Sequence, residues 1–362
     1  MKYLDEYRDP EMAKKLISSI TSAATRQIRL MEVCGTHTVS IFRSGIKDLL
    51  PENISLISGP GCPVCVTPNE EIDAAIEIAK QDDVILTTFG DMIKVPGSTS
   101  SLEKERALGA DVRVVYSSLD ALEIARKLPQ KKVVLLGIGF ETTSPTIASA
   151  IISANRDKLG NFSILAAHKL IPPAMRALLD SKEVKISGFL CPGHVSAIIG
   201  SRPYEFIAQD YGVPCVVAGF EPLDILNGIL MLVKQVESGD ASVDIQYRRV
   251  VRPDGNAAAL GILNDAFHVC DARWRGLGNI PESGLKIRDK YRQFDARSNF
   301  DIDIVPTDEP AGCLCGEILR GVKVPSDCAL FAKTCTPGSP VGPCMVSSEG
   351  TCAAHFKYGV NH

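Results

Sequence analysis

Six cysteines lie close together near the end of this 362-residue chain, and cysteine sulfur binds soft metals and exchanges electrons as thiol and disulfide. These residues are Cys313, Cys315, Cys328, Cys335, Cys344 and Cys352. The segment around them is rich in Gly, Pro and Ser and has little periodic apolar pattern, so it buries little surface on its own. We expect bound metal or disulfides to order it, and we predict an iron–sulfur redox module.

The spacing of these thiols limits the kinds of site they can form. Cys313 and Cys315 form a C-x-C pair, and the run as a whole differs from the C-x2-C-x2-C-x3-C pattern of bacterial ferredoxins. Six thiols exceed what one tetrahedral site needs, so a four-thiolate site plus one thiol pair fits the count. Iron–sulfur clusters and zinc both accept four cysteines, and the spacing does not separate them.

A second cysteine motif, C-x-x-C, lies between a predicted strand and a predicted helix. Its members are Cys62 and Cys65, whose sulfurs can form a disulfide across one turn. A helix N-terminus there would lower the pKa of the thiols and favour the reactive thiolate. C-x-x-C also forms half of many zinc sites, but no second close pair lies nearby in the sequence. Redox chemistry is therefore the preferred interpretation.

Cys34 also follows a predicted strand, in the sequence Cys-Gly-Thr-His. A lone cysteine in this position is commonly a small buried apolar residue. His37, three residues later, would hold or deprotonate a nearby group. Cys34 is therefore a candidate soft ligand for a transition metal.

Single polar residues follow the carboxyl ends of other predicted strands. They are Asp91, Glu141, His194 and Glu221. Each of them alone is commonly a helix cap or a hydrogen-bonded polar side chain. As a set at one edge of parallel sheets, they would serve as proton donors or would orient metal ligands.

The remaining candidates are weaker. His168 and Lys169 also follow a strand, but no motif accompanies them. Cys191, Cys215 and Cys270 lie in apolar surroundings, which predicts that they are core residues.

Short apolar strands alternate with helices along most of the chain. The predicted strands are 28–33, 54–57, 84–88, 112–116, 133–138, 162–166, 186–190 and 214–218. This alternation predicts parallel sheets covered by helices on both faces. Loop motifs of the first half recur loosely in the second half, at the sheet edge where open α/β sheets bind ligands. The alternative is that βα turns collect Gly, Pro and polar residues in any case.

We therefore predict an α/β fold with two similar parallel-sheet domains that face a cleft, plus a smaller irregular cysteine-rich iron–sulfur domain. The expected boundaries are an N-terminal helical segment 1–27 that packs with the C-terminal domain, α/β domains over 28–130 and 131–250, and a helical and cluster-binding domain over 251–362.

Composition and charge exclude several classes of protein. The net charge of −4 carries no signature of nucleic-acid or anionic-membrane binding. No stretch of about 18 apolar residues is present, and the charged N-terminus argues against a signal peptide. We expect a cytoplasmic protein, where twelve cysteines favour metal binding or catalysis over structural disulfides.

Seven sequence blocks in order along the chain carry a family resemblance. They are residues 34–38, 59–65, 89–92, 139–143, 191–195, 218–222 and 344–352, which read CGTHT, GPGCPVC, FGDM, GFETT, CPGHV, AGFEP and CMVSSEGTC. In these blocks the chain resembles the HypD family of [NiFe]-hydrogenase maturation factors. The resemblance implies two α/β domains and a third domain with a [4Fe–4S] cluster. It also implies a scaffold for the Fe(CN)2CO moiety, with a HypC-type chaperone sharing the iron and a HypE-type partner donating cyanide from a thiocyanate.

Carried onto this sequence, the resemblance assigns roles to the cysteines. It implies that the cluster ligands are Cys313, Cys328, Cys335 and Cys352. By the same resemblance, Cys315 and Cys344 form the remaining thiol pair, Cys62 and Cys65 the redox pair in the cleft, and Cys34 the residue that binds iron with its CN and CO ligands.

Two other functions compete with this interpretation. The first is a cluster-dependent thiol–disulfide reductase that acts on a protein partner. The second is a zinc-stapled binding protein without redox activity. The sequence has no G-x-x-x-x-G-K-[ST] loop and so gives no sign of nucleotide hydrolysis.

Overall fold

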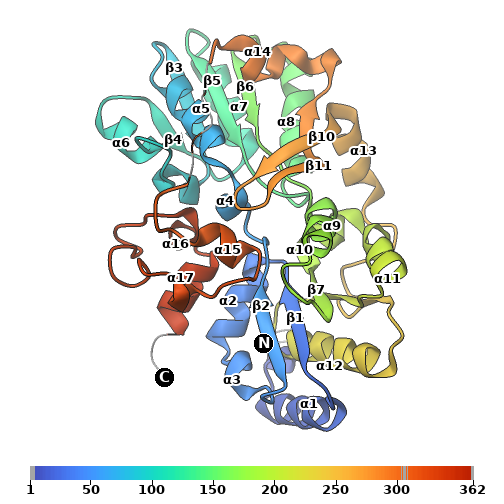
Figure 1. The fold of residues 1–362 in the computed structure, drawn as a ribbon. Coiled ribbons are helices and arrows are strands. Elements are labelled where there is room, and N and C mark those ends of the chain that lie inside the picture. The colour runs from blue at the N-terminus through green and yellow to red at the C-terminus, as the bar shows by residue number, and fades with distance from the viewer. Residues whose placement is uncertain (1–4, 303, 305–306, 308, 360–362) are drawn as a thin grey trace.

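Two parallel β-sheets form the framework of the computed structural model, which describes residues 5–302, 304, 307 and 309–359 (Figure 1). Sheet A has the order β2-β1-β7-β8-β9, and its strands are β1 (Ile28–Glu32), β2 (Ile54–Ser58), β7 (Gly188–Pro192), β8 (Cys215–Ala218) and β9 (Val243–Ile245). Sheet B has the order β4-β3-β5-β6, with β3 (Val84–Thr88), β4 (Val112–Val114), β5 (Lys132–Gly137) and β6 (Phe162–Ala166). The predicted α/β class with parallel sheets is confirmed.

Helices cover both faces of each sheet, as expected for short parallel strands that are mostly apolar. One face of sheet A packs on α1 (Pro10–Ala23), α2 (Gly35–Arg43), α3 (Ile46–Leu49) and α12 (Pro222–Ser238). The other face packs on α4 (Pro63–Val66), α9 (Ile171–Ser181), α10 (Gly193–Ile199) and α11 (Glu205–Tyr211).

Sheet B is enclosed in the same way. One of its faces packs on α5 (Asn69–Ala79), α6 (Leu102–Ala107) and α14 (Ala296–Asn299). The opposite face packs on α7 (Ser118–Lys127), α8 (Ser144–Arg156) and α13 (Ala257–Ala266), together with an antiparallel hairpin of β10 (Phe267–Trp274) and β11 (Gly278–Ile287). Short 3-10 helices lie at Asp5–Tyr7, Gly90–Lys94, Arg202–Tyr204, Asp289–Phe294 and Pro325–Asp327.

The expected division of the chain at residue 130 does not match the sheets. Strand β1 pairs in parallel with β7, so that Leu30 lies opposite Gly188, and sheet A therefore combines an early and a late segment of the chain. Sheet B is built entirely from the segment between them. Alternating strands and helices show that the sheets are parallel, but they do not show which strands are neighbours, because pairing depends on contacts far apart in sequence.

The N-terminal helix packs elsewhere than expected. Asp9 caps α1 by accepting hydrogen bonds from the backbone N–H groups of Glu11 and Met12. The apolar side of α1, centred on the buried Ile20, packs against α12 of sheet A rather than against the segment 251–362. The stripe of apolar residues predicted the helix, and only the tertiary structure identifies its partner.

The cysteine-rich tail consists largely of loops, as its composition predicts. Its short helices are α15 (Cys315–Leu319), α16 (Pro343–Val346) and α17 (Thr351–Tyr358). The tail shares its apolar cluster with sheet A: α15 and α16 contact α4, and α17 lies along α2 (Figure 1). The tail is thus held by the framework. Among the described helices, none combines the length and the apolar composition that a membrane crossing requires.

Candidate functional site

The site begins where two neighbouring strands end. Strands β1 and β2 run parallel with Glu32 opposite Ser58, so their loops emerge at the same edge of sheet A. There the backbone N–H of Gly35 donates to the carbonyl oxygen of Gly61 at 2.9 Å. A Cβ on Gly61 would lie 2.1 Å from the backbone nitrogen of Cys34, so only glycine allows this approach. The contact sets the Cys34 segment directly against the C-x-x-C segment.

Cys62 and Cys65 form a disulfide across the single turn of α4. Cys62 is the N-cap residue, and its sulfur accepts a hydrogen bond from the backbone N–H of Cys65 at 3.2 Å. The helix that follows, α5 (Asn69–Ala79), matches the expected range of about Thr67 to Lys80. Pro68 separates it from α4, because proline lacks an N–H and disfavours helical geometry at the residue before it. A helix dipole at the pair is therefore limited to one turn, contrary to the expectation from the sequence.

Cys34 lies at the N-cap position of α2 and is 7% exposed. Burial raises the pKa of its thiol to about 12, backbone hydrogen bonds from His37 and Thr36 oppose this shift, and the carboxylate of Glu349 adds to it. The thiol therefore keeps its proton at neutral pH until a positive charge, such as a metal ion, replaces the proton.

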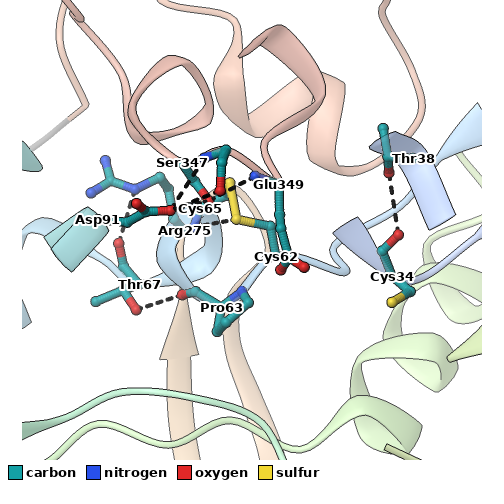
Figure 2. The surroundings of a disulfide bond; sticks show 11 residues. Cys34, Thr38, Cys62, Pro63, Cys65, Thr67, Asp91, Arg275, Ser347 and Glu349 are labelled. Carbon is teal, nitrogen blue, oxygen red and sulfur yellow. Dashed lines mark hydrogen bonds between the residues drawn. A yellow bond between two sulfur atoms is a disulfide. The ribbon is translucent and has the colours of Figure 1, made fainter. Parts of the chain in front are cut away.

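A segment of the tail covers this pair of loops, as Figure 2 shows. Thr36 donates through Oγ1 to Glu349 at 2.5 Å, and a Cβ on Gly35 would lie 2.6 Å from the backbone oxygen of Glu349. Asp91 accepts hydrogen bonds from the Ser348 backbone N–H at 3.2 Å and from the Ser347 hydroxyl at 3.4 Å. Asp91, predicted from the sequence, thus anchors the tail to sheet B.

Glu349 lies in the site, although no function was assigned to it from the sequence. It lies inside the block CMVSSEGTC, which carried part of the family resemblance, but no spacing rule connects it with Cys34 more than 300 positions earlier. Its carboxylate is the nearest acidic influence on the Cys34 thiol. The same charge acts on His194, which brings His194 into the site.

Two histidines share one aromatic ring in the site. His194 stacks on Phe220 with a centroid distance of 3.9 Å, and His37 lies 4.9 Å from the same ring. A ring nitrogen of His37, Nε2, hydrogen-bonds the carbonyl oxygen of Gly219 at 2.9 Å. Burial lowers the pKa of His194 and lowers that of His37 to about 4, so both rings are neutral at pH 7. Neutral imidazoles can accept a proton or bind a metal.

Two predicted carboxylates form interactions with residues other than Cys34. Glu221 is the N-cap residue of α12 and forms an ion pair with Arg8, with nitrogen–oxygen distances of 2.5 and 2.9 Å. Glu141 is buried and accepts a hydrogen bond from the Ile171 backbone N–H at 3.0 Å, at the start of α9. Burial raises the pKa of Glu141 to about 7, so it is a buried proton-carrying group rather than a fixed charge.

Glu32 is a second residue that the sequence did not identify. It lies in β1 beside the Cys34 loop, is 3% exposed, and accepts a hydrogen bond from Thr38 at 2.8 Å. Its other oxygen has no hydrogen-bond partner among the described residues. Burial raises the pKa of Glu32 to about 8, so the carboxyl group is largely protonated at neutral pH.

The six tail cysteines are brought together by the fold. The thiols of Cys313, Cys315, Cys344 and Cys352 interact in series, so that Cys315 and Cys344 lie side by side. The other two cysteines form hydrogen bonds with the backbone. The Cys328 thiol donates to the Gly312 carbonyl at 3.7 Å, and the Cys335 sulfur accepts from the Val341 N–H at 3.3 Å. All six are free thiols in the structure.

Arg275, at the end of the β10–β11 hairpin, links the hairpin to the segment after Cys65. Its guanidinium donates to the Thr67 carbonyl and to Asn69 at 2.9 and 2.8 Å, just beyond Cys65. The neighbouring Cys344 thiol and burial hold the pKa of Cys315 well above its ordinary value, and the charge of Arg275 opposes this shift. One buried cation therefore lies between the C-x-x-C segment and the tail thiols, as Figure 2 shows for its position beside Cys65.

The ligand atoms that the tail offers, cysteine sulfurs, are of the type that iron–sulfur clusters use. Six free thiols in one loop-built segment match the thiolate ligands that such clusters use. No three His, Cys, Asp or Glu side chains of residues 5–302 and 309–359 converge on a position for a single metal ion. The arrangement of the tail thiols therefore gives no support to a preformed tetrahedral zinc site over a cluster.

Cys191 and Cys215 are buried in neighbouring strands of sheet A, in agreement with their prediction as core residues. Cys270 is different: the helix expected to contain it ends at Ala266, and Cys270 lies half-buried in β10. Phe267, Val269 and Trp274 are residues of types that favour a strand.

We predict that Gly61→Ala separates the two loops. The new methyl group meets backbone atoms of Val33 and Cys34, which cannot rotate away, so the free energy of unfolding should fall by about 1–3 kcal/mol. Gly261→Ala in α13 is the matched control: it has open space and should gain about 0.5–1 kcal/mol. Urea denaturation measures both, and equal stability of Gly61→Ala and wild type would contradict the close approach.

Stability should depend on pH through Glu32. The pKa of the Glu32 carboxyl group is near 4.5 in the unfolded chain and about 8 in the folded protein. Its contribution to the stability of the fold is therefore complete below pH 4.5, and it is lost as the pH rises through 8. Glu32→Gln should therefore be more stable than wild type at pH 9, by on the order of 4 kcal/mol, and the difference should shrink toward pH 5. Glu52→Gln at an exposed position should show no such trend in urea midpoints measured from pH 5 to 9.

Comparison with known proteins agrees with the order of the sequence blocks. The HypD family model, described as "Hydrogenase formation hypA family", matches residues 11–359. The chain is similar to hydrogenase maturation factor HypD2 of Bradyrhizobium diazoefficiens, with 49% identity across 99% of this chain and 97% of that protein. It is also similar to hydrogenase maturation factor HypD of Cupriavidus necator, with 48% identity across 99% of this chain and 97% of that protein. Its identity to hydrogenase maturation factor HypD of Escherichia coli is 46%, across 99% of this chain and 98% of that protein. The match covers nearly the whole chain, and the protein belongs to the HypD family of hydrogenase maturation factors.

Proposed function

We propose that this protein is a scaffold on which the Fe(CN)2CO part of a [NiFe]-hydrogenase active site is assembled, together with a HypC-type chaperone and a HypE-type cyanide donor. Family membership supports a role in hydrogenase maturation. The observation that carries the proposal is the hydrogen bond from Gly35 to Gly61, which sets a candidate iron ligand, Cys34, against a redox-active pair, Cys62 and Cys65.

Cys34 would hold the iron that is the substrate of this assembly. Its buried thiol is protonated at neutral pH, so binding iron exchanges a proton for the metal. The neutral rings of His37 and His194 would orient the iron ligands, because His37 Nδ1 has no partner among the described residues. A thiolate together with cyanide and carbonyl would hold iron in a soft ligand field.

Cys62 and Cys65 would supply the two electrons that cyanide transfer requires. A thiocyanate R–S–CN and two thiols yield R–SH, cyanide, one proton and a disulfide, so the sulfur–carbon bond breaks and the donor sulfur is reduced. Cyanide leaves with the bonding electron pair and binds iron. The Cys62–Cys65 disulfide corresponds to the state after this step.

Reduction of the Cys62–Cys65 disulfide to two thiols requires two electrons, which the cysteine-rich tail would supply. We propose Cys313, Cys328, Cys335 and Cys352 as the ligands of a [4Fe–4S] cluster, which when bound supplies electrons one at a time. Cys315 and Cys344 would form the thiol pair between these ligands and Cys65, and their direct interaction and the packing of α15 and α16 on α4 support this role.

The alternative is a cluster-dependent thiol–disulfide reductase acting on a protein partner. The disulfide in the single turn of α4, with free thiols packed beside it, also fits this activity. The two functions differ in their products: the reductase turns over a generic disulfide and carries no diatomic ligands. Infrared spectra of the anaerobic protein with its chaperone partner separate them.

Replacement of Cys34 tests the iron site. In Cys34→Ala, the cyanide and carbonyl infrared bands of the complex with the HypC-type partner should be lost, and iron outside the cluster should fall at least about tenfold. The cluster absorbance should persist, because the tail thiols are untouched. Cys215→Ala, which removes a buried thiol from β8, should keep the bands. Unchanged bands in Cys34→Ala would overturn the role of Cys34.

Replacement of the redox pair tests the electron supply. Cys62→Ser cannot form the disulfide, so mixing with the thiocyanate-loaded HypE-type partner should yield no cyanide bands, while iron binding at Cys34 persists. Iron content and infrared bands are measured on the same sample. Wild-type intensity of the cyanide bands in this variant would show that electrons come from elsewhere.

A further inference from the structure

A second cavity lies outside the cysteine site, at the carboxyl end of β6 beneath the β10–β11 hairpin. Its volume is about 430 Å³, which is within the range of small-molecule pockets. Its walls come from the start of α5, the residues after β6, the hairpin and α14. The chemistry-bearing side chains on these walls include Lys169, His168 and Cys270.

Lys169 is a buried cation on the wall of this cavity. It is 3% exposed, and its backbone is fixed by a hydrogen bond to the Gly139 carbonyl at 3.0 Å and by a β-bridge to Gly284. Its ammonium group has no hydrogen bond or ion pair with another described residue. A buried charge without a direct partner is costly, and burial accordingly lowers the pKa of Lys169.

Two of the four carboxylates on the cavity wall, Glu70 and Glu71, are paired with arginines. Glu70 forms an ion pair with Arg273 at 3.2 Å, and Glu71 forms one with Arg297. Both pairs lie on the walls of the cavity and leave Lys169 as the buried charge that faces its interior. Asp271 and Asp295 also line the cavity and accept hydrogen bonds from the backbone N–H groups of Glu282 and Arg297. An anion inside the cavity would give the buried Lys169 the direct partner that the described residues do not supply.

His168 offers a second polar contact. Its ring is 1% exposed, packs edge-on against Phe267 at 5.4 Å, and has no hydrogen-bond partner at either nitrogen among the described residues. Burial lowers its pKa to about 3, so the ring is neutral and carries one N–H donor. A buried ring with two unsatisfied nitrogens requires a partner that the described part of the chain does not supply.

We propose that this cavity binds a small oxyanion, a carboxylate or a phosphate, with Lys169 as its counter-charge and His168 as a hydrogen-bond donor. A metal ion does not suit the cavity, since no three potential ligands among the described residues converge there and the cation of Lys169 would repel it. The site is independent of the chemistry proposed at Cys34, with which it shares no lining residue.

Calorimetric titration of the anaerobic full-length protein tests this site, with inorganic phosphate and malonate as separate probes at constant ionic strength. Saturable binding of phosphate alone identifies a phosphoryl ligand, and binding of malonate alone identifies a carboxylate. Lys169→Gln should weaken binding at least about thirtyfold, because it removes the buried counter-charge. Lys286→Gln, the same charge change at an exposed position on the cavity rim, should weaken it less than about threefold.

A measurement on the wild-type protein keeps the test independent of how Lys169→Gln folds. Cys270 lines the cavity, so the bound probe should slow its alkylation by iodoacetamide in a saturable manner, followed by mass spectrometry of the Cys270 peptide. Absence of both heat and protection with either probe would overturn the proposal. Equal weakening of binding by the two lysine variants would also overturn it. The anion would then be attracted by the overall positive charge of the cavity wall and not by a specific contact with Lys169.

Discussion

One close backbone contact organises the functional part of this protein. The ends of β1 and β2 meet where Gly35 donates to Gly61, and no side chain fits between them. The contact follows from the parallel register of the two strands, which brings both loops to the same sheet edge. A cysteine that follows each strand is thereby placed at one site, although nearly thirty residues separate Cys34 from Cys62. The remaining parts of the site are added around this contact.

Burial sets the protonation of the groups around the contact. Desolvation raises the pKa of the Cys34 thiol and of the Glu32 carboxyl, and it lowers the pKa of His37. Near neutral pH the site therefore holds its thiol and carboxyl groups largely protonated and its imidazole neutral, with little net charge. Such a site favours a reaction in which an incoming cation displaces a proton. Glu349 is an acidic residue of the tail that lies beside the Cys34 loop, where it accepts a hydrogen bond from Thr36.

The tail has too little apolar surface to fold alone and takes its order from the framework. Asp91 holds its loop from sheet B, Thr36 holds Glu349 from α2, and Arg275 links the hairpin to the segment after Cys65. These contacts come from three distant parts of the chain. They pack the thiols of the tail against the C-x-x-C turn in one shared apolar cluster, which is the arrangement that a thiol relay needs.

The sequence by itself determined the parallel α/β class, the positions of most strands and the family, because these depend on local apolar patterns and on motif spacing. It did not determine that sheet A joins β1 to β7, that α1 packs on α12, or that the C-x-x-C pair lies in a separate single turn, α4. Nor did it reveal Glu32 and Glu349, or that Glu221 pairs with Arg8. Strand pairing, burial and charge neighbours depend on contacts between residues far apart in the chain, and only the tertiary structure decides them.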